Sequence, residues 1–287
     1  MEKIEQKETN QETNEKIIEK TIFPYIDTHC HLDMIFERVK LNYSKKSWTE
    51  IQQELKFEEG IQNAVAIACD PINFDTVFDI VSKYEPVYGA FGLHPHDSKK
   101  FNQDIENKLV EFMKNPKIKA WGEMGLDYHY NFSPKEDQIN AFTKQLKKAI
   151  ELQKPLVIHT REAEEDTLKI FKEFIPKEWK FHVHCYTSSL EFAENIMKEW
   201  PNAYFGFTGV ITFKTAKNLL KVVEKVPLDR ILSETDGPYM APVPYRGKIA
   251  HPGMIPKIID KIVSVKKIQK EKVYSTLVEN AKNFYQF

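Results

Sequence analysis

The chain alternates short runs of β-branched and aromatic residues with longer runs of helical periodicity, and it does so eight times after residue 20. The short runs are predicted strands: Tyr25–His31, Ala64–Cys69, Val87–Gly92, Ile118–Glu123, Leu156–His159, Phe181–Cys185, Ala203–Phe207 and Ile231–Glu234. No linker rich in Gly or Ser separates them. Eight strands, each followed by a helix, predict one α/β domain over residues 21–287, a (β/α)8 TIM barrel.

Two helical patterns are clear enough to place in detail. One helix is predicted with Ser133 as its N-cap and Pro134 at its first position. Its apolar side chains recur at helical spacing: Ile139, Phe142, Leu146 and Ile150. Two more helices close the chain, and the first of them carries a single apolar stripe: Ile255, Ile258, Ile259 and Ile262.

Composition limits the class of protein. The 41 Lys and Arg residues balance 42 Asp and Glu residues, so the net charge near −1 gives no overall attraction for nucleic acid, and phosphate recognition has to be local. Three cysteines without a C-x-x-C pair (Cys30, Cys69 and Cys185) predict a reduced compartment, and we expect a cytoplasmic or nuclear protein. Residues 1–20 predict a flexible polar tail, and no apolar run reaches the roughly 20 residues that a membrane helix needs.

Side chains that can bind metals recur at the predicted strand ends: His29, His31, Glu123, His159, His184 and Asp236. His29 and His31 stand in "DTHCHLD", and residues two apart on an extended strand project from the same face. Each residue has another reading, since His159 fits a hydrogen-bonded core histidine, Glu123 an ion-pair partner and Asp236 a turn cap. Taken together at the mouth of one barrel, they predict a shared cation, because buried charges without partners are strongly disfavoured.

Several separated motifs resemble the TatD-type metal-dependent deoxyribonucleases of the amidohydrolase-like superfamily: "DTHCHLD", "FGLHPH", "GEMGLDYH", "PLVIHTREA", "HVHCYTSS" and "ETDGPYMAPVPYRGK". The resemblance runs from about Tyr25 to the C-terminus. It implies a TIM barrel that binds one or two divalent ions, and the histidine and carboxylate donors suit Zn²⁺, Mn²⁺ or Mg²⁺. It also implies hydrolysis of phosphodiester bonds in DNA, usually from the 3′ end.

Carried over residue by residue, the resemblance assigns His29, His31 and Asp236 to one ion, with Glu123 bridging to a second ion held by His159 and His184. His182 lies two residues before His184 and competes for this role, but the residue directly before the Cys-aromatic pair matches the family. The expected catalytic residues are Asp236, as general base, and Glu123. Asp27 and Asp33 flank the H-x-H and could orient its rings, or serve as caps or surface ion pairs.

Phosphate and base recognition need further side chains near the metals. The candidates are Arg161, His94, Tyr128, His129 and Arg246, with Lys248 and Tyr130 as neighbours of the same kind. Cys30 and Cys185 adjoin predicted ligands, but neighbouring strand residues face away from each other, so neither is assigned to a metal.

The expected function is therefore a metal-dependent 3′–5′ exonuclease of single-stranded DNA or DNA 3′ ends, acting as a monomer in DNA repair or degradation. One alternative keeps the barrel and the metals and changes the substrate to a cyclic amide, a lactone or an aminoacyl-tRNA ester. A second alternative is a binding platform with a vestigial site, which the complete set of competent ligand residues disfavours.

We predict that deleting residues 1–20 leaves the melting temperature and the hydrolytic rate unchanged. This segment lacks a periodic apolar face and contributes no proposed ligand. Thermal unfolding and turnover of the truncated chain, beside the full-length chain, test this. A large fall in either quantity would show that the segment docks on the domain.

Overall fold

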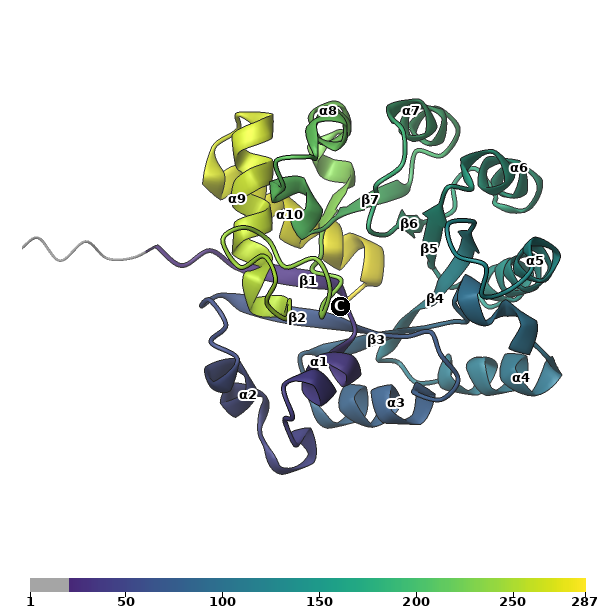
Figure 1. The fold of residues 1–287 in the computed structure, drawn as a ribbon, viewed down its shortest axis with the longest axis horizontal. Helices are drawn as coiled ribbons and strands as arrows, with labels where there is room; N and C mark the ends of the chain where they lie inside the picture. Colours follow the sequence, from purple (N-terminus) through teal and green to yellow (C-terminus); the bar gives the residue numbers. More distant parts are fainter. Residues whose placement is uncertain (1–20) are drawn as a thin grey trace, which may run out of the picture.

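The computed structural model describes residues 21–287, so the tail predicted over residues 1–20 lies outside the described residues. The described part contains eight strands: β1 (Tyr25–Cys30), β2 (Ile61–Ala68), β3 (Val87–Phe91), β4 (Ile118–Asp127), β5 (Leu156–Arg161), β6 (Phe181–Val183), β7 (Ala203–Phe207) and β8 (Ile231–Ser233). They form one parallel sheet in the order β1-β2-β3-β4-β5-β6-β7-β8. Figure 1 shows this sheet curling around a centre with the helices outside it, the (β/α)8 barrel that the sequence predicts.

Helices follow the strands along the chain: α1 (Leu32–Arg38), α2 (Trp48–Glu54), α3 (Phe74–Lys83), α4 (Gln103–Phe112), α5 (Lys135–Glu151), α6 (Glu164–Phe174), α7 (Leu190–Glu199), α8 (Lys217–Lys225), α9 (Ile255–Lys266) and α10 (Lys270–Tyr285). The predicted isoleucine stripe of α9 is buried, as expected. None of these described helices is both long enough and apolar enough to cross a membrane.

Hydrogen bonds from side chains join β1 to β8, the first and last strands of the sheet. The Thr28 hydroxyl donates to the carbonyl of Ser233 at 3.1 Å, and the Ser233 hydroxyl donates to the carbonyl of Ile26 at 3.3 Å. Just beyond the strands, the Asp236 amide donates to the carbonyl of His29 at 2.9 Å. The seam thus fixes two chain segments that carry predicted metal ligands.

Helix α10 covers the end of the barrel at which the strands begin. Its Ala281, Phe284 and Tyr285 pack in one apolar cluster with strand residues such as Ile26 and Val65. Near its end, the carbonyl of Gln286 accepts a hydrogen bond from the Lys119 ammonium group, at the start of β4. The last helix therefore covers the amino ends of the strands and leaves the carboxyl ends open for a site.

Four strands are shorter than predicted (β1, β3, β6 and β8), and after two of them the backbone turns into a left-handed conformation. β6 stops at Val183 rather than Cys185, and β8 stops at Ser233 rather than Glu234. Cys185 and Asp236 have φ values of 42° and 50°, in the left-handed region that ends extended structure. The predicted ligands His184 and Asp236 consequently lie on the loops that follow these strands.

The predicted start of α5 is wrong by one residue. The helix begins at Lys135 with Pro134 at the N-cap position, and no side chain among residues 21–287 caps it. The Ser133 hydroxyl is directed elsewhere, since it donates to the carbonyl of His96 at 2.7 Å and accepts from the Lys99 amide. Ser133 thus holds the loop after β3 rather than the helix.

Helix α5 also buries two glutamines that an amphipathic pattern would leave in water, Gln138 and Gln145. The Gln145 side chain accepts from the Leu93 amide and from the Trp121 indole, and it donates to the carbonyl of Leu93. Gln138 binds both backbone groups of Asp127 in the same way. These amides fasten the ends of β3 and β4 to α5.

We predict that Gln145→Leu lowers the free energy of unfolding by at least about 2 kcal/mol, because it leaves several buried polar groups without partners. Urea denaturation measures the change. Gln53→Leu, at an exposed position of α2, is the control and should change the value by less than about 0.5 kcal/mol. An unchanged urea midpoint for Gln145→Leu would contradict the role of this amide.

Candidate metal centre

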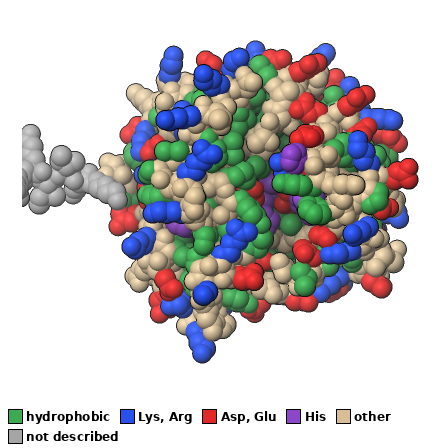
Figure 2. Space-filling model, viewed as in Figure 1, with side chains coloured by type: hydrophobic (Ala, Val, Ile, Leu, Met, Phe, Trp, Pro, Cys, Tyr) green, Lys and Arg blue, Asp and Glu red, His purple; other side chains and the backbone are tan. Residues whose placement is uncertain are grey.

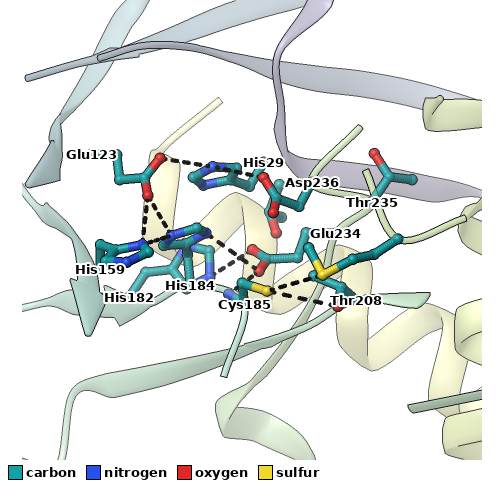
Figure 3. A network of polar contacts seen from close by, with 12 residues as sticks. His29, Glu123, His159, His182, His184, Cys185, Thr208, Glu234, Thr235 and Asp236 are labelled. Carbon is teal, nitrogen blue, oxygen red and sulfur yellow. Dashed lines mark hydrogen bonds and ion pairs between the residues drawn. The ribbon is translucent and has the colours of Figure 1, made fainter. Parts of the chain in front are cut away.

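A cavity of about 940 Å³ opens at the carboxyl ends of the strands. Five of the six predicted ligands line it: His31, Glu123, His159, His184 and Asp236. The sixth, His29, is fully buried and its ring stacks directly on that of His184, with 3.9 Å between ring centroids. The structure therefore brings all six side chains together, as Figure 3 shows for the core of the cluster.

The Glu123 carboxylate lies at the middle of this cluster. Its Oε1 is 2.7 Å from His184 Nε2, 2.8 Å from His159 Nδ1 and 3.3 Å from His94 Nε2. Its Oε2 is 3.5 Å from His29 Nε2. Glu123 occupies this place because β4 approaches β5 closely at Gly122, where an added Cβ would meet the carbonyl oxygen of Val157 at 2.3 Å.

Asp236 lies close to His29 on β1 and to His31 just after this strand. Its Oδ1 is 3.3 Å from His31 Nε2 and 3.6 Å from His29 Nε2. The buried Asp27 carboxylate fixes the Asp236 loop, because it accepts from the Thr235 amide at 3.0 Å and the Thr235 hydroxyl at 2.5 Å. Asp27 also accepts from the His29 amide, so it anchors backbone and does not orient the histidine rings.

His29 is the side chain that most needs a cation. Neither of its ring nitrogens has a hydrogen bond within residues 21–287, although the ring is 0% exposed. Burial, together with the charge of His184, lowers the pKa of His29 to about 3, which keeps the ring neutral. A neutral imidazole with an unused lone pair is the form of histidine that binds a metal.

The carboxylates of the cluster stay ionised. Burial alone would raise the pKa of Glu123, but the charges of His184 and His94 hold it well below its usual value. Burial also opposes ionisation of Asp236, and the hydrogen bond and charge of His31 lower its pKa. The same contacts raise the pKa of His31 to about 9 against the effect of burial, and a divalent ion would compete with that proton.

Three sets of these side chains place their ligand atoms within 4.8 Å of one another. The sets are His29, His184 and Asp236; His29, His31 and Glu123; and His94, Glu123 and His159. The donor chemistry, imidazole nitrogen with carboxylate oxygen, fits Zn²⁺ or Mn²⁺, and Mg²⁺ if water completes its shell. The described residues therefore fit one or two divalent ions.

Two buried carboxylates support the cluster from outside. Asp127, at the end of β4, lies 3.1 Å from His159 Nε2 and 3.0 Å from His96 Nε2, and these histidines lower its pKa although burial raises it. Sequence reasoning did not single out Asp127 or His96. The only available signal was that Asp127 belongs to the same motif as Glu123, because which ring it would meet depends on the fold.

The second supporting carboxylate, Glu234, lies beside His182, the residue that competes with His184 for the predicted ligand role. His182 is turned away from the cavity, and its Nε2 lies 2.9 Å from Glu234 Oε2. Burial raises the pKa of Glu234 to about 8 and lowers that of His182, so both groups are neutral. Gly206 leaves room for this pair, because an added Cβ would lie 2.3 Å from His182 Nε2. His184 alone of the two reaches Glu123.

The predicted substrate contacts divide into two groups. Arg161 and His94 line the cavity. Tyr128, His129 and Arg246 are not among the described residues that line it. The Tyr128 hydroxyl donates to Asp166, His129 lies against Glu162, and the Arg246 guanidinium covers the ring of Phe213.

The aromatic side chains that do line the cavity are Tyr130 and Phe132 on the β4–α5 loop and Tyr239 on the β8–α9 loop. The motif "DYHYNF" indicated aromatic residues near the site, but a loop without regular periodicity gives no basis for choosing among them. Tyr239 was missed altogether.

The expectation that Cys185 faces away from the site is wrong, since this side chain lines the cavity. Strand alternation ends at Val183, and the positive φ of Cys185 redirects it. Its Sγ lies 3.8 Å from Thr208 Oγ1 and 3.7 Å from Met240 Sδ, and burial raises the pKa of the thiol well above its usual value. Cys30 is buried and does not line the cavity.

A parallel (β/α)8 barrel with histidines and carboxylates clustered at its carboxyl face suits a metal-dependent hydrolase. A family model described as "TatD related DNase" matches residues 26–286. The chain belongs to the TatD family of metal-dependent hydrolases.

Curated relatives agree with this assignment. The chain is 38% identical over 91% of its length to the human 3′-5′ RNA nuclease TATDN2, of which it spans about a third (35%). It is 34% identical to the uncharacterized metal-dependent hydrolase YabD of Bacillus subtilis, and that match covers 90% of this chain and 98% of YabD.

Solved structures share the fold. The TatD homolog YJJV of Escherichia coli superposes with a TM-score of 0.79 at 24% identity, over 92% of this chain and 98% of that one. A TatD family hydrolase of Entamoeba histolytica superposes with a TM-score of 0.78 at 23% identity, over 93% and 99% of the two chains.

We predict that Glu123→Gln lowers the affinity for a divalent ion by more than about 100-fold. The amide loses the negative charge that five histidine rings surround, and loss of an outer supporting group alone costs about 10- to 100-fold. Titration calorimetry with Mn²⁺ or Zn²⁺ measures the change. Glu151→Gln, an exposed position on α5, is the control. If the two variants bind the divalent ion with equal affinity, Glu123 is not a metal ligand.

Proposed function

We propose that this chain hydrolyses phosphodiester bonds of single-stranded DNA or DNA 3′ ends, releasing nucleotides from the 3′ end, as an enzyme of DNA repair or degradation. The observation that carries the proposal is the buried Glu123 carboxylate among five imidazoles, in a cavity that Arg161 also lines. Metal ligands beside a guanidinium suit a substrate with an anionic phosphate group.

The metal ligands we propose are His29, His31, Glu123, His159, His184 and Asp236. Bound there, one or two divalent ions would supply Lewis-acid activation of the phosphoryl group and lower the pKa of water. The protein residues hold the ligand rings in place: Asp127 fixes His159, while the Asp27–Thr235 contact fixes the loop that bears Asp236.

Asp236 is the proposed general base. It lines the cavity, and its lowered pKa keeps the carboxylate ionised, the form that can accept a proton. Glu123 is also ionised, but it is more deeply enclosed, with Oε1 close to three rings. We therefore assign proton transfer to Asp236, while Glu123 would help to hold the ions.

Arg161 is the proposed phosphate-binding residue. It ends β5, lines the cavity, and has its guanidinium 5.0 Å from the centre of the Tyr130 ring. A planar guanidinium can bind two phosphate oxygens at once. His94, 3.3 Å from Glu123, is a second group that could donate to the substrate from the cavity wall.

The names of the relatives support a nucleic acid substrate, but they do not agree on whether it is DNA or RNA. The family description names DNase activity, whereas the human relative is named as an RNA nuclease. Matched single strands of DNA and RNA, labelled at the 5′ end, should be incubated with metal-loaded protein beside duplex DNA, a lactone, a cyclic amide and an aminoacyl-tRNA.

Stepwise shortening of labelled single-stranded DNA from its 3′ end is the expected result of that assay. Faster shortening of RNA would correct the substrate while keeping the reaction. Turnover of the lactone, the cyclic amide or the aminoacyl ester with both nucleic acids left intact would favour the alternative hydrolase class. No turnover of any substrate by protein shown to contain metal would contradict hydrolysis altogether.

We predict that Asp236→Asn lowers kcat by about 10²- to 10⁴-fold, because the amide cannot accept the proton. Metal affinity should fall only modestly, so the loss should persist at saturating Mn²⁺ or Zn²⁺. Initial rates over a metal titration measure this, with Asp229→Asn, at an exposed position, as the control. If excess metal restores a near-normal rate, Asp236 is only a ligand and another group takes the proton.

A further inference from the structure

Three aromatic side chains of the cavity wall are unusually exposed. Phe132 is 56% exposed, Tyr130 43% and Tyr239 42%. Leaving such rings in water forfeits favourable apolar burial, which is worth about 25 cal/mol per Å². Figure 2 shows hydrophobic side chains flanking the hollow in which histidines are visible. Exposed rings beside a metal centre indicate a ligand with flat apolar faces.

The rings stand on two separate sides of the cavity. Tyr130 and Phe132 belong to the β4–α5 loop, and their ring centroids are 5.4 Å apart. Tyr239 belongs to the loop after β8. β4 and β8 are four strands apart in a sheet of eight, so the two loops lie opposite each other across the barrel mouth. The metal ligands lie at the floor between them.

An arginine accompanies the aromatic group on each side. The Arg161 guanidinium lies 5.0 Å from the Tyr130 ring centre, and the Arg38 guanidinium, from α1, lies 4.6 Å from the Tyr239 ring centre. Both contacts are within cation–π range. Each side of the cavity thus combines a guanidinium with an aromatic ring. This combination suits a nucleic acid strand, in which flat bases alternate with negative phosphates.

Two acidic side chains of the cavity wall lie beside a lysine. Asp70 and Asp97 both line the cavity, but the Lys100 ammonium lies 3.8 Å from the first and 2.6 Å from the second. Among residues 21–287, neither Arg161 nor Arg38 forms an ion pair, so both leave positive charge for an anionic strand.

We propose that Phe132 and Tyr239 stack on two unpaired nucleobases at the end of a nucleic acid strand, one on each side of the metal centre. Arg161 and Arg38 hold the adjoining phosphates. This inference rests on the proposed nuclease function and defines its substrate as an end with at least two unpaired nucleotides. Stacking accepts any base, because every base has a π-face, so the contact selects single strands without selecting sequence.

The test compares strands of equal charge that differ only in their bases. Single strands of DNA, and of RNA, should carry a normal 3′ end or an abasic residue at the terminal or the penultimate position. Wild-type metal-loaded protein is assayed beside Phe132→Ala, Tyr239→Ala, Phe132→Tyr and Tyr239→Phe. Val243→Ala, a 48% exposed residue of the same loop as Tyr239 that does not line the cavity, is the control.

Wild-type protein should prefer the normal strand over each abasic strand by about 5- to 150-fold in kcat/KM, the range expected for one stacked base. Each alanine variant should lose the preference at one of the two positions through KM, with metal content unchanged. The conservative variants and Val243→Ala should keep both preferences.

A wild-type enzyme that cleaves normal and abasic strands equally would overturn the stacking proposal while leaving the nuclease intact. Alanine variants that keep both preferences would overturn it as well. If no strand is hydrolysed, the proposed function fails, and fluorescence anisotropy of the same strands and variants then decides whether the rings bind bases. Equal anisotropy-derived Kd values for wild type and alanine variants would reject the two stacking positions.

Discussion

The carboxylate of Glu123 is the group on which the architecture of this protein depends. It is a charge buried at the centre of the barrel mouth, and imidazoles from β1, the β3 loop, β5 and the β6 loop surround it. An isolated buried charge is strongly disfavoured, so its neighbours have to supply positive charge or hold a cation. The ring of His29 is buried, and neither of its nitrogens has a hydrogen bond among residues 21–287, which indicates that the neighbours alone do not complete the site.

Segments far apart in the chain keep these rings in place. The Asp27 carboxylate joins β1 to the loop after β8, and the Tyr285 hydroxyl of the last helix donates to the carbonyl of Thr28, one residue before His29. The Glu234–His182 pair lies beneath His184, and Glu234 also accepts from the Cys185 amide. The first strand, the last strand and the last helix are therefore all needed for one metal centre, so the site is a property of the whole barrel.

The sequence predicts the barrel and brings the six ligand candidates together because both follow from periodicity: strand runs alternate with helices, and the carboxyl ends of parallel strands meet. It does not predict which residues support the ligands. The contacts of Asp127 with His159 and His96 depend on how strands and loops are aligned in the folded barrel. The contact of Glu234 with His182 depends on the same alignment. Irregular loops have no period, which is why Tyr128 and His129 were chosen as contacts and Tyr239 was missed. Buried polar residues such as Gln145 break the rule that polar helix positions face water.

Anomalous X-ray diffraction from crystals grown with Mn²⁺ tests the central claim most directly. Data collected on either side of the manganese absorption edge locate the ion without reference to any enzymatic activity. The account predicts one or two difference peaks among the Glu123 carboxylate, the His29, His31, His159 and His184 rings, and Asp236. A protein whose peaks lie elsewhere, for example at the exposed His129–Glu162 pair, with none beside Glu123, would contradict it.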